Sequence, residues 1–339
     1  MSWYTRVRGD PLSWLCEPDH TNPAVRYFAL RELRDRPADD PEVVEAQAAN
    51  MTGGPVPAIL AAQQPEGYWQ HPGSGYGKYR GTVWQIMFLS ELGVDPSDVR
   101  LRRGCDYVLG HSVASSGGFA YYKKPQPGGV VHCLTGNLLA ALIRLGWLAD
   151  ERVQRALEWQ ARAITGEPPI QFTRYGTSGP EFTCQINENQ PCGWGATKAM
   201  KALVAVPPEQ RSPIVWHALE RGADFLLRYD LAQAAYPYTR TVSANWFALG
   251  FPLSYWSDLL ETLAVLAALG YGGDPRLAGA VDWLLSKQDA QGKWTLEHGL
   301  NGHMWVDIEQ QGKPSKWITL RALRALKALA DGARAGTRR

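Results

Sequence analysis

The sequence lacks several features that would define a class of protein on their own. Its 35 lysines and arginines nearly balance 33 aspartates and glutamates, and a net charge of +2 gives no sign of nucleic-acid binding. No apolar run approaches the ~18 residues of a membrane span, and the start, MSWYTRVRGDPLSW, has no signal-peptide segment. Five cysteines, an odd number, do not suggest a disulfide framework. We expect a soluble cytoplasmic protein, with peripheral membrane contact left open and the oligomeric state undetermined.

Convincing strand patterns are also missing, and helical patterns take their place. Six apolar helical segments recur along the chain, at residues 25–33, 82–93, 133–146, 192–206, 257–270 and 316–329. A short segment close to Asp-Pro-x-x-Val follows several of them, as in DDPEVV from Asp39 and GDPRLA from Gly273. Such a repeat indicates one supersecondary unit used several times.

The helices are of two kinds. The segment 259–269 is apolar nearly all round and should be buried on every side, whereas 274–287 has one apolar and one solvated face. Six alternations predict an all-α fold, closed as an (α/α)6 toroid of inner and outer helices; an open solenoid is the alternative. The expected organisation is an N-terminal segment packing on the toroid (1–21), the toroid itself (22–330) and a basic disordered tail (331–339).

One motif, Gln-x-x-x-Gly-x-Trp, occurs twice in the sequence. The first copy has Gln63, Gly67 and Trp69, and the second has Gln288, Gly292 and Trp294. Each copy begins at the end of an outer helix. The amide can bond open backbone groups of helix ends, the glycine lets the chain turn, and the indole can fill space between repeats. We interpret the motif as structural.

With these copies, the sequence resembles the superfamily of squalene–hopene cyclases and protein prenyltransferase β-subunits. It looks most like the single-domain bacterial proteins described as prenyltransferase/squalene-oxidase repeat proteins, over about residues 22–330. The resemblance implies a terpenoid-cyclase toroid whose cavity opens at the N-terminal ends of the inner helices. It also implies an apolar small-molecule substrate, of isoprenoid type.

Three cysteines are candidates for a metal site. Cys133 and Cys192 each begin an inner helix in a Cys-x-x-Gly sequence, and Cys184 lies in the loop before the second. Three thiols meeting at the cavity mouth would suit Zn²⁺, with His132, His303 or water as the remaining ligand. The alternative is that the cysteines are small apolar fillers. The resemblance points to a zinc site at this end, but the Asp-x-Cys ligand pair of the prenyltransferases is absent.

Asp258 is the candidate catalytic acid. It stands at the first turn of the apolar helix 257–270, where an aromatic cavity would raise its pKa and let it serve as a general acid. The resemblance implies that such an acid protonates an alkene. The resemblance supports such an acid, but the Asp-x-Asp-Asp motif of the cyclases is absent, as is Asp-Asp-x-x-Asp. Capping of the helix is the alternative role.

Aromatic residues near the same helix ends are the candidate substrate-binding groups, because ring faces stabilise cations. They are Trp84, Trp194, Tyr255, Trp305 and Trp317. In the last helix, Arg321, Arg324 and Lys327 recur every three residues and could meet a diphosphate, although a solvated face is the preferred interpretation.

Two functions from different classes remain. The first is a terpenoid-cyclase-like or prenyltransferase-like enzyme that binds an isoprenoid substrate and uses acid-assisted or metal-assisted catalysis. The second is an (α/α) toroid that binds a ligand without catalysis, or that acts on carbohydrate. The repeated motif favours the first, and the missing acid motifs favour the second.

Overall fold

The computed structural model describes residues 3–168, 178–238 and 242–336, and within them the regular secondary structure is almost wholly helical. The elements are α1 (Pro11–Cys16), α2 (Pro23–Phe28), α3 (Pro41–Thr52), α4 (Pro55–Ala61), α5 (Thr82–Glu91), α6 (Val99–His111), α7 (His132–Arg144), α8 (Glu151–Thr165), α9 (Gly193–Ala205), α10 (Pro213–Leu227), α11 (Leu259–Ala268), α12 (Ala278–Ser286), α13 (Lys316–Gly336) and the strands β1 (Thr183–Cys184), β2 (Gln190–Pro191), β3 (Trp294–Thr295) and β4 (Pro314–Ser315). The strands form two antiparallel pairs, β1 with β2 and β3 with β4.

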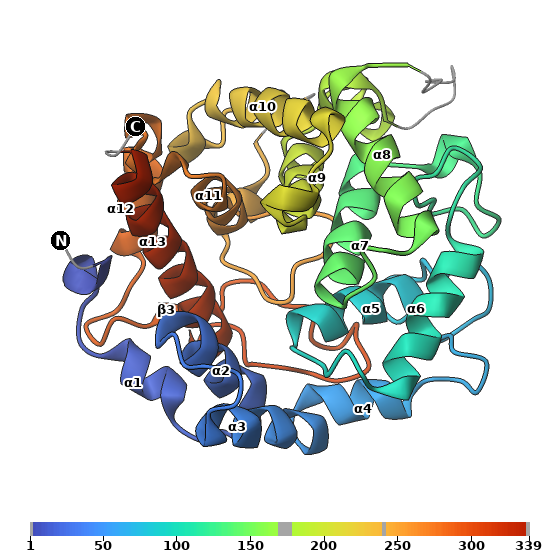
Figure 1. Ribbon diagram of the computed structural model, residues 1–339. Helices are drawn as coiled ribbons and strands as arrows, with labels where there is room; N and C mark the ends of the chain where they lie inside the picture. Colours follow the sequence, from blue (N-terminus) through green and yellow to red (C-terminus); the bar gives the residue numbers. More distant parts are fainter. Residues whose placement is uncertain (1–2, 169–177, 239–241, 337–339) are drawn as a thin grey trace.

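The helices form an inner and an outer ring (Figure 1). The inner ring runs through α2, α5, α7, α9, α11 and α13, and α13 packs against α2 to close it. Helices α3, α4, α6, α8, α10 and α12 lie outside. The predicted all-α toroid is therefore confirmed, and the six inner helices fall on the six apolar segments of the sequence. Their burial explains the pattern: every residue of α5 from Thr82 to Ser90 is buried.

The two motif tryptophans make matching contacts. Both side chains are 0% exposed. The indole N–H of Trp69 donates to the carbonyl of Ile59 at 2.7 Å, and that of Trp294 donates to the carbonyl of Leu284 at 2.7 Å. Each ring thus holds the last turn of the outer helix that precedes it. The ring of Trp69 also lies where a Cβ on Gly104 would stand, which explains the glycine inside α6.

The two motif glutamines show how the ring closes. Gln63 donates to the carbonyl of Arg100 in α6, the next outer helix. The corresponding Gln288 accepts from the backbone N–H of Arg8, immediately before α1, at 2.8 Å. By this equivalence, α1 occupies the outer position beside α13, and the N-terminal segment packs against the last repeat.

The end of the chain differs from the expected layout. Helix α13 continues to Gly336, so residues 331–336 are helical where the sequence predicts the start of a disordered tail. The segment reads DGARAG and has no strong helix propensity, but α13 packs here against residues Tyr271–Gly273, and Gly332 lies close to Gly270 and Gly272. Residues 337–339 lie outside the described residues.

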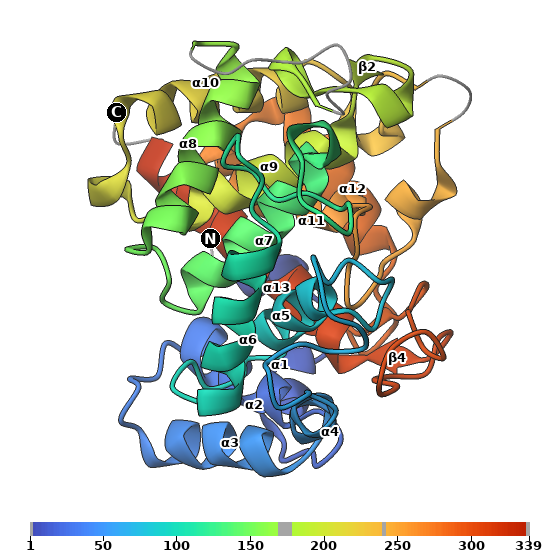
Figure 2. The ribbon, with the colours of Figure 1, turned by 90° about the vertical axis from the view of Figure 1, so that its right-hand side faces the viewer.

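The two faces of the toroid have different connections. Links from inner to outer helices, such as 92–98 and 145–150, are short, whereas links from outer to inner helices, such as 62–81 and 287–315, are long. Figure 2 shows the long loops gathered on one side, with β2 and β4 among them. They cover the N-terminal ends of the inner helices. Across the described ranges, every helix is too short or too polar to cross a membrane.

Candidate functional site

A pocket with a volume of about 510 Å³ lies at the face with the short connections. Its walls come from the C-terminal parts of α5, α7 and α9, from α11, from α13 and from the end of the first inner segment. The cavity inferred from the family resemblance opens at the other end of the ring, so this pocket is a different one, and that expectation stays a prediction.

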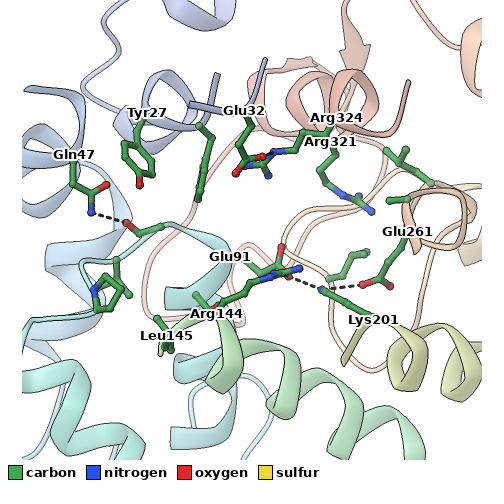
Figure 3. A pocket seen from close by; sticks show the side chains of 18 residues that line it. Tyr27, Glu32, Gln47, Glu91, Arg144, Leu145, Lys201, Glu261, Arg321 and Arg324 are labelled. Carbon is green, nitrogen blue, oxygen red and sulfur yellow. Dashed lines mark hydrogen bonds and ion pairs between the residues drawn. The ribbon is translucent and has the colours of Figure 1, made fainter. Parts of the chain in front are cut away.

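The pocket wall is strongly charged (Figure 3). Apolar contributions come from residues such as Phe28, Leu253 and Leu260. The ionisable side chains that line it are Glu32, Glu91, Arg144, Lys201, Glu261, Arg321 and Arg324. A wall of this kind suits a polar, ionic ligand better than a hydrocarbon chain.

A chain of ion pairs joins four inner helices at this wall. Lys201 of α9 lies between two carboxylates: its Nζ is 2.6 Å from Glu91 Oε1 on α5 and 3.0 Å from Glu261 Oε1 on α11. On the other side of Glu91, the Nη1 atom of Arg144 in α7 lies 3.2 Å from Glu91 Oε1. Behind the wall, the fully buried Lys198 Nζ lies 2.7 Å from Glu261 Oε2. Figure 3 shows Lys201 between the two glutamates.

Both carboxylates stay ionised at neutral pH. Burial acts to raise the pKa of Glu91, but Lys201 and Arg144 outweigh it and hold that pKa well below its usual range. At Glu261 burial is likewise outweighed by Lys198 and Lys201, which lower the pKa to about 2. Neither glutamate can therefore protonate a substrate.

The low pKa of Glu261 makes a prediction about acid stability. Because the folded pKa of about 2 lies below the ordinary value of 4.5, its stabilisation is complete above pH 4.5 and is lost as the pH falls towards 2. The wild type should lose about 2 kcal/mol more unfolding free energy than Glu261→Gln between pH 7 and pH 3. Urea unfolding at both pH values measures this. Equal losses in the two proteins would contradict it.

Asp258, the candidate acid, lies beside the pocket but is fully engaged. Its side chain is 0% exposed, and Arg321 binds both carboxylate oxygens at 2.8 Å. The backbone N–H groups of Gly250 and Glu261 also donate to it, and the second of these bonds caps α11. These are the contacts of a structural carboxylate, and the catalytic role of Asp258 stays a prediction.

A loop, residues 249–257, crosses the interior of the ring. The carbonyl of Ser254 accepts from the Asn137 amide of α7 at 2.7 Å, and Phe251 stacks on Trp317 of α13 with ring centroids 4.2 Å apart. Helices α7 and α13 stand on opposite sides of the inner ring. Leu253 of the same loop lines the pocket. The loop 249–257 thus fills the centre of the toroid, and it forms one boundary of the pocket.

The five candidate aromatic residues lie elsewhere. Trp84 and Trp317 are 1% exposed and bond the Tyr76 carbonyl and the Asn22 side chain, so they belong to the core. The half-buried Trp194 and Tyr255 meet edge to face, and Trp305 is 38% exposed. None of the five lines the pocket, because all come from the opposite end of the ring. Their role in substrate binding stays a prediction.

The three candidate cysteines affect one another's pKa, so they are neighbours, but they do not form a zinc site. The neighbouring thiol of Cys192 lowers the pKa of Cys184 to about 6, and burial raises the pKa of Cys133 to about 12. No group of three His, Cys, Asp or Glu side chains in the described residues could hold a metal ion. His132 cannot complete a site, because Gly179 and Gln160 engage its two ring nitrogens. The residues present do not fit zinc, and His303 lies on an exposed loop.

The pocket contains residues that sequence reasoning missed. Glu91 and Arg144 are single charges in the otherwise apolar helices α5 and α7, and α9 carries two, Lys201 at the pocket and Lys198 behind its wall. Such charges are rarely buried unless they are paired, so their positions carried a usable signal. The interpretation of Arg321 as part of a solvated face is wrong, because its side chain is 12% exposed and is bound to Asp258.

Comparison with known proteins gives fold likeness alone. No protein-family model matches the sequence, and no curated protein matches it. An unsaturated glucuronyl hydrolase specific for heparin aligns at TM-score 0.48 and 11% identity, covering 92% of this chain and 86% of its own. A protein from Actinoplanes aligns at TM-score 0.43 and 16% identity, covering 86% of this chain and 80% of its own. The type II terpene cyclase MstE from Scytonema aligns at TM-score 0.28 and 13% identity, covering 82% of this chain and 96% of its own. At these scores the likenesses reveal nothing about chemistry.

Proposed function

We propose that this chain is an (α/α) toroid protein that binds a small, polar, anionic molecule in the charged pocket. The observation that supports this most is the set of four cationic side chains, Arg144, Lys201, Arg321 and Arg324, that line a space of about 510 Å³. They come from three different inner helices and stand near helix C-termini or helix middles. Binding fits this wall better than acid catalysis does, because Glu91 and Glu261 remain ionised.

Arg144 is the side chain best placed to receive the anion. Within the described part of the chain its guanidinium has one carboxylate partner, Glu91, at 3.2 Å, and its side chain is 44% exposed. An arginine has five N–H donors in a planar fork, so most of them remain for a carboxylate or phosphate. Glu91 is also paired with Lys201, so at this end of the pocket one carboxylate faces two cationic side chains.

A thermal-shift panel tests the proposal. Phosphate, citrate and glucuronate represent polar anions, and farnesol and geranylgeraniol represent apolar isoprenoids. We expect at least one anion to stabilise the wild type, by about 2.7 kcal/mol at 100 times its Kd, with a much smaller effect on Arg144→Met. Arg155→Met, on the outer helix α8, is the matched control and should respond like the wild type. Stabilisation by the isoprenoid alcohols alone would contradict the proposal.

An enzyme acting on an isoprenoid substrate is the second candidate, and one observation favours it. Aromatic rings gather at the N-terminal ends of the inner helices: Tyr76 and Tyr79 contact Trp84, and the Lys78 ammonium lies 4.0 Å above the ring of Tyr255. Such rings suit an apolar or cationic group. The isoprenoid arm of the same panel tests this candidate, since its ligand would bind independently of Arg144.

A further inference from the structure

Two cysteines are held on the same face of a small hairpin. Strands β1 and β2 pair with Cys184 opposite Gln190, and Cys192 donates its backbone N–H to Phe182 at 2.9 Å. Side chains alternate along a strand, so Cys192, two residues beyond Gln190, points to the same face as Cys184. The Cys192 thiol is also the strongest influence lowering the pKa of Cys184, as expected of two neighbouring side chains on one face.

A third thiol lies nearby but is attached differently. Cys133 is the second residue of α7, and it interacts electrostatically with Cys184 and Cys192. It is fixed on a long inner helix of the ring. Cys184 and Cys192, in contrast, are eight positions apart on one short hairpin. Closing a short loop costs little chain entropy, so the hairpin pair is the favoured one.

We propose that Cys184 and Cys192 form a redox-active dithiol, which peroxide oxidises reversibly to a disulfide. A disulfide needs Cα atoms about 4.4–6.8 Å apart, and diagonal residues of an antiparallel pair stand about 7–8 Å apart. Closure therefore requires a small approach of the two strands. Strands of two residues each can approach one another in this way, and the movement reaches the first turn of α9, which Cys192 caps. The inference does not depend on the ligand proposed for the pocket.

The chemistry balances with hydrogen peroxide as the oxidant. One thiol loses its proton and its sulfur attacks a peroxide oxygen; the O–O bond breaks, an S–O bond forms, and the first water leaves. The second sulfur then attacks the resulting sulfenic acid, forms the S–S bond and releases the second water. The two thiols lose two protons and two electrons, and the peroxide is reduced to two molecules of water.

Oxidation would act at the start of α9. Cys192 is the N-cap of that helix, and its Sγ accepts the backbone N–H of Gly195 at 3.4 Å. The same helix carries Lys201 to the pocket. The disulfide would fix the hairpin to the first turn of this helix.

Thiol mapping of the wild-type protein tests the inference. The protein is treated with hydrogen peroxide, denatured, alkylated with iodoacetamide and cleaved after glutamate, which separates the two cysteines at Glu188. We expect the alkylatable thiols to fall by two from the initial five, with the Cys184 and Cys192 peptides joined. Dithiothreitol should restore both.

Two variants make the result specific. Cys133→Ser should give the same cross-linked peptides, and Cys192→Ser should give none, with Cys184 oxidised singly. A disulfide that contains Cys133 in the wild type would overturn the inference. So would a wild-type protein in which peroxide oxidises Cys184 to the sulfinate while Cys192 remains free for alkylation.

Discussion

Replacing Glu261 with alanine is expected to lower the free energy of unfolding by about 3–5 kcal/mol. The reason is the lysine that the change leaves behind. Lys198 is 0% exposed, and its Nζ contacts both oxygens of Glu261, at 2.9 and 2.7 Å. Burial already lowers the pKa of Lys198, and removing the carboxylate would leave this charge without a partner. Urea unfolding followed by circular dichroism at pH 7 measures the loss.

A double variant separates the lost partner from the lost volume. In Lys198→Met/Glu261→Leu, both charges disappear together and similar volumes remain, so most of the stability should return. Lys201 keeps its contact with Glu91 in this variant. If the double variant were as unstable as the sum of the two single changes, the buried ion pair would not be the cause.

Replacing Trp294 with alanine is expected to cost about 3–5 kcal/mol, because it empties a fully buried site. The change removes the indole and its hydrogen bond to Leu284 at 2.7 Å. It also loosens the junction of the last repeat with the N-terminal segment, where Gln288 binds the backbone of Arg8. Thermal and urea unfolding measure the effect.

Two further substitutions control for the tryptophan. Trp294→Phe keeps most of the apolar volume and should lose much less stability. Trp216 of α10 is 44% exposed, so Trp216→Ala should stay within about 0.5 kcal/mol of the wild type. A loss at Trp294→Ala no larger than that at Trp216→Ala would contradict the structural role of the motif.

The architecture could be predicted because burial leaves a periodic pattern in the sequence. Segments such as 82–93 are apolar on all sides, whereas 274–287 has one solvated face, so the inner and outer helices differ in their residue patterns alone. Equivalent glutamines, Gln63 and Gln288, mark equivalent places in the repeat. The closure through α1 could not be predicted, because six residues of helix give no clear period.

The pocket could not be predicted in the same way. Which end of a toroid is open depends on loops, and the path of residues 249–257 across the ring has no local signature. The sequence around Asp258 is compatible with a helix cap and with a buried catalytic acid. Its two hydrogen bonds from Arg321, which favour the structural role, are seen only in the structure. The pairing of Lys201 with Glu91 joins residues 110 positions apart, so no spacing in the sequence could show it.

The most direct test of the proposed function is to identify what the protein carries when it is purified without detergent or chelator. Wild-type protein and Arg144→Met/Arg324→Met would be denatured, and the released small molecules would be identified by mass spectrometry. We predict a polar anion, released from the wild type and absent from the double variant. An isoprenoid lipid released in equal amounts from both proteins would contradict a charged binding pocket.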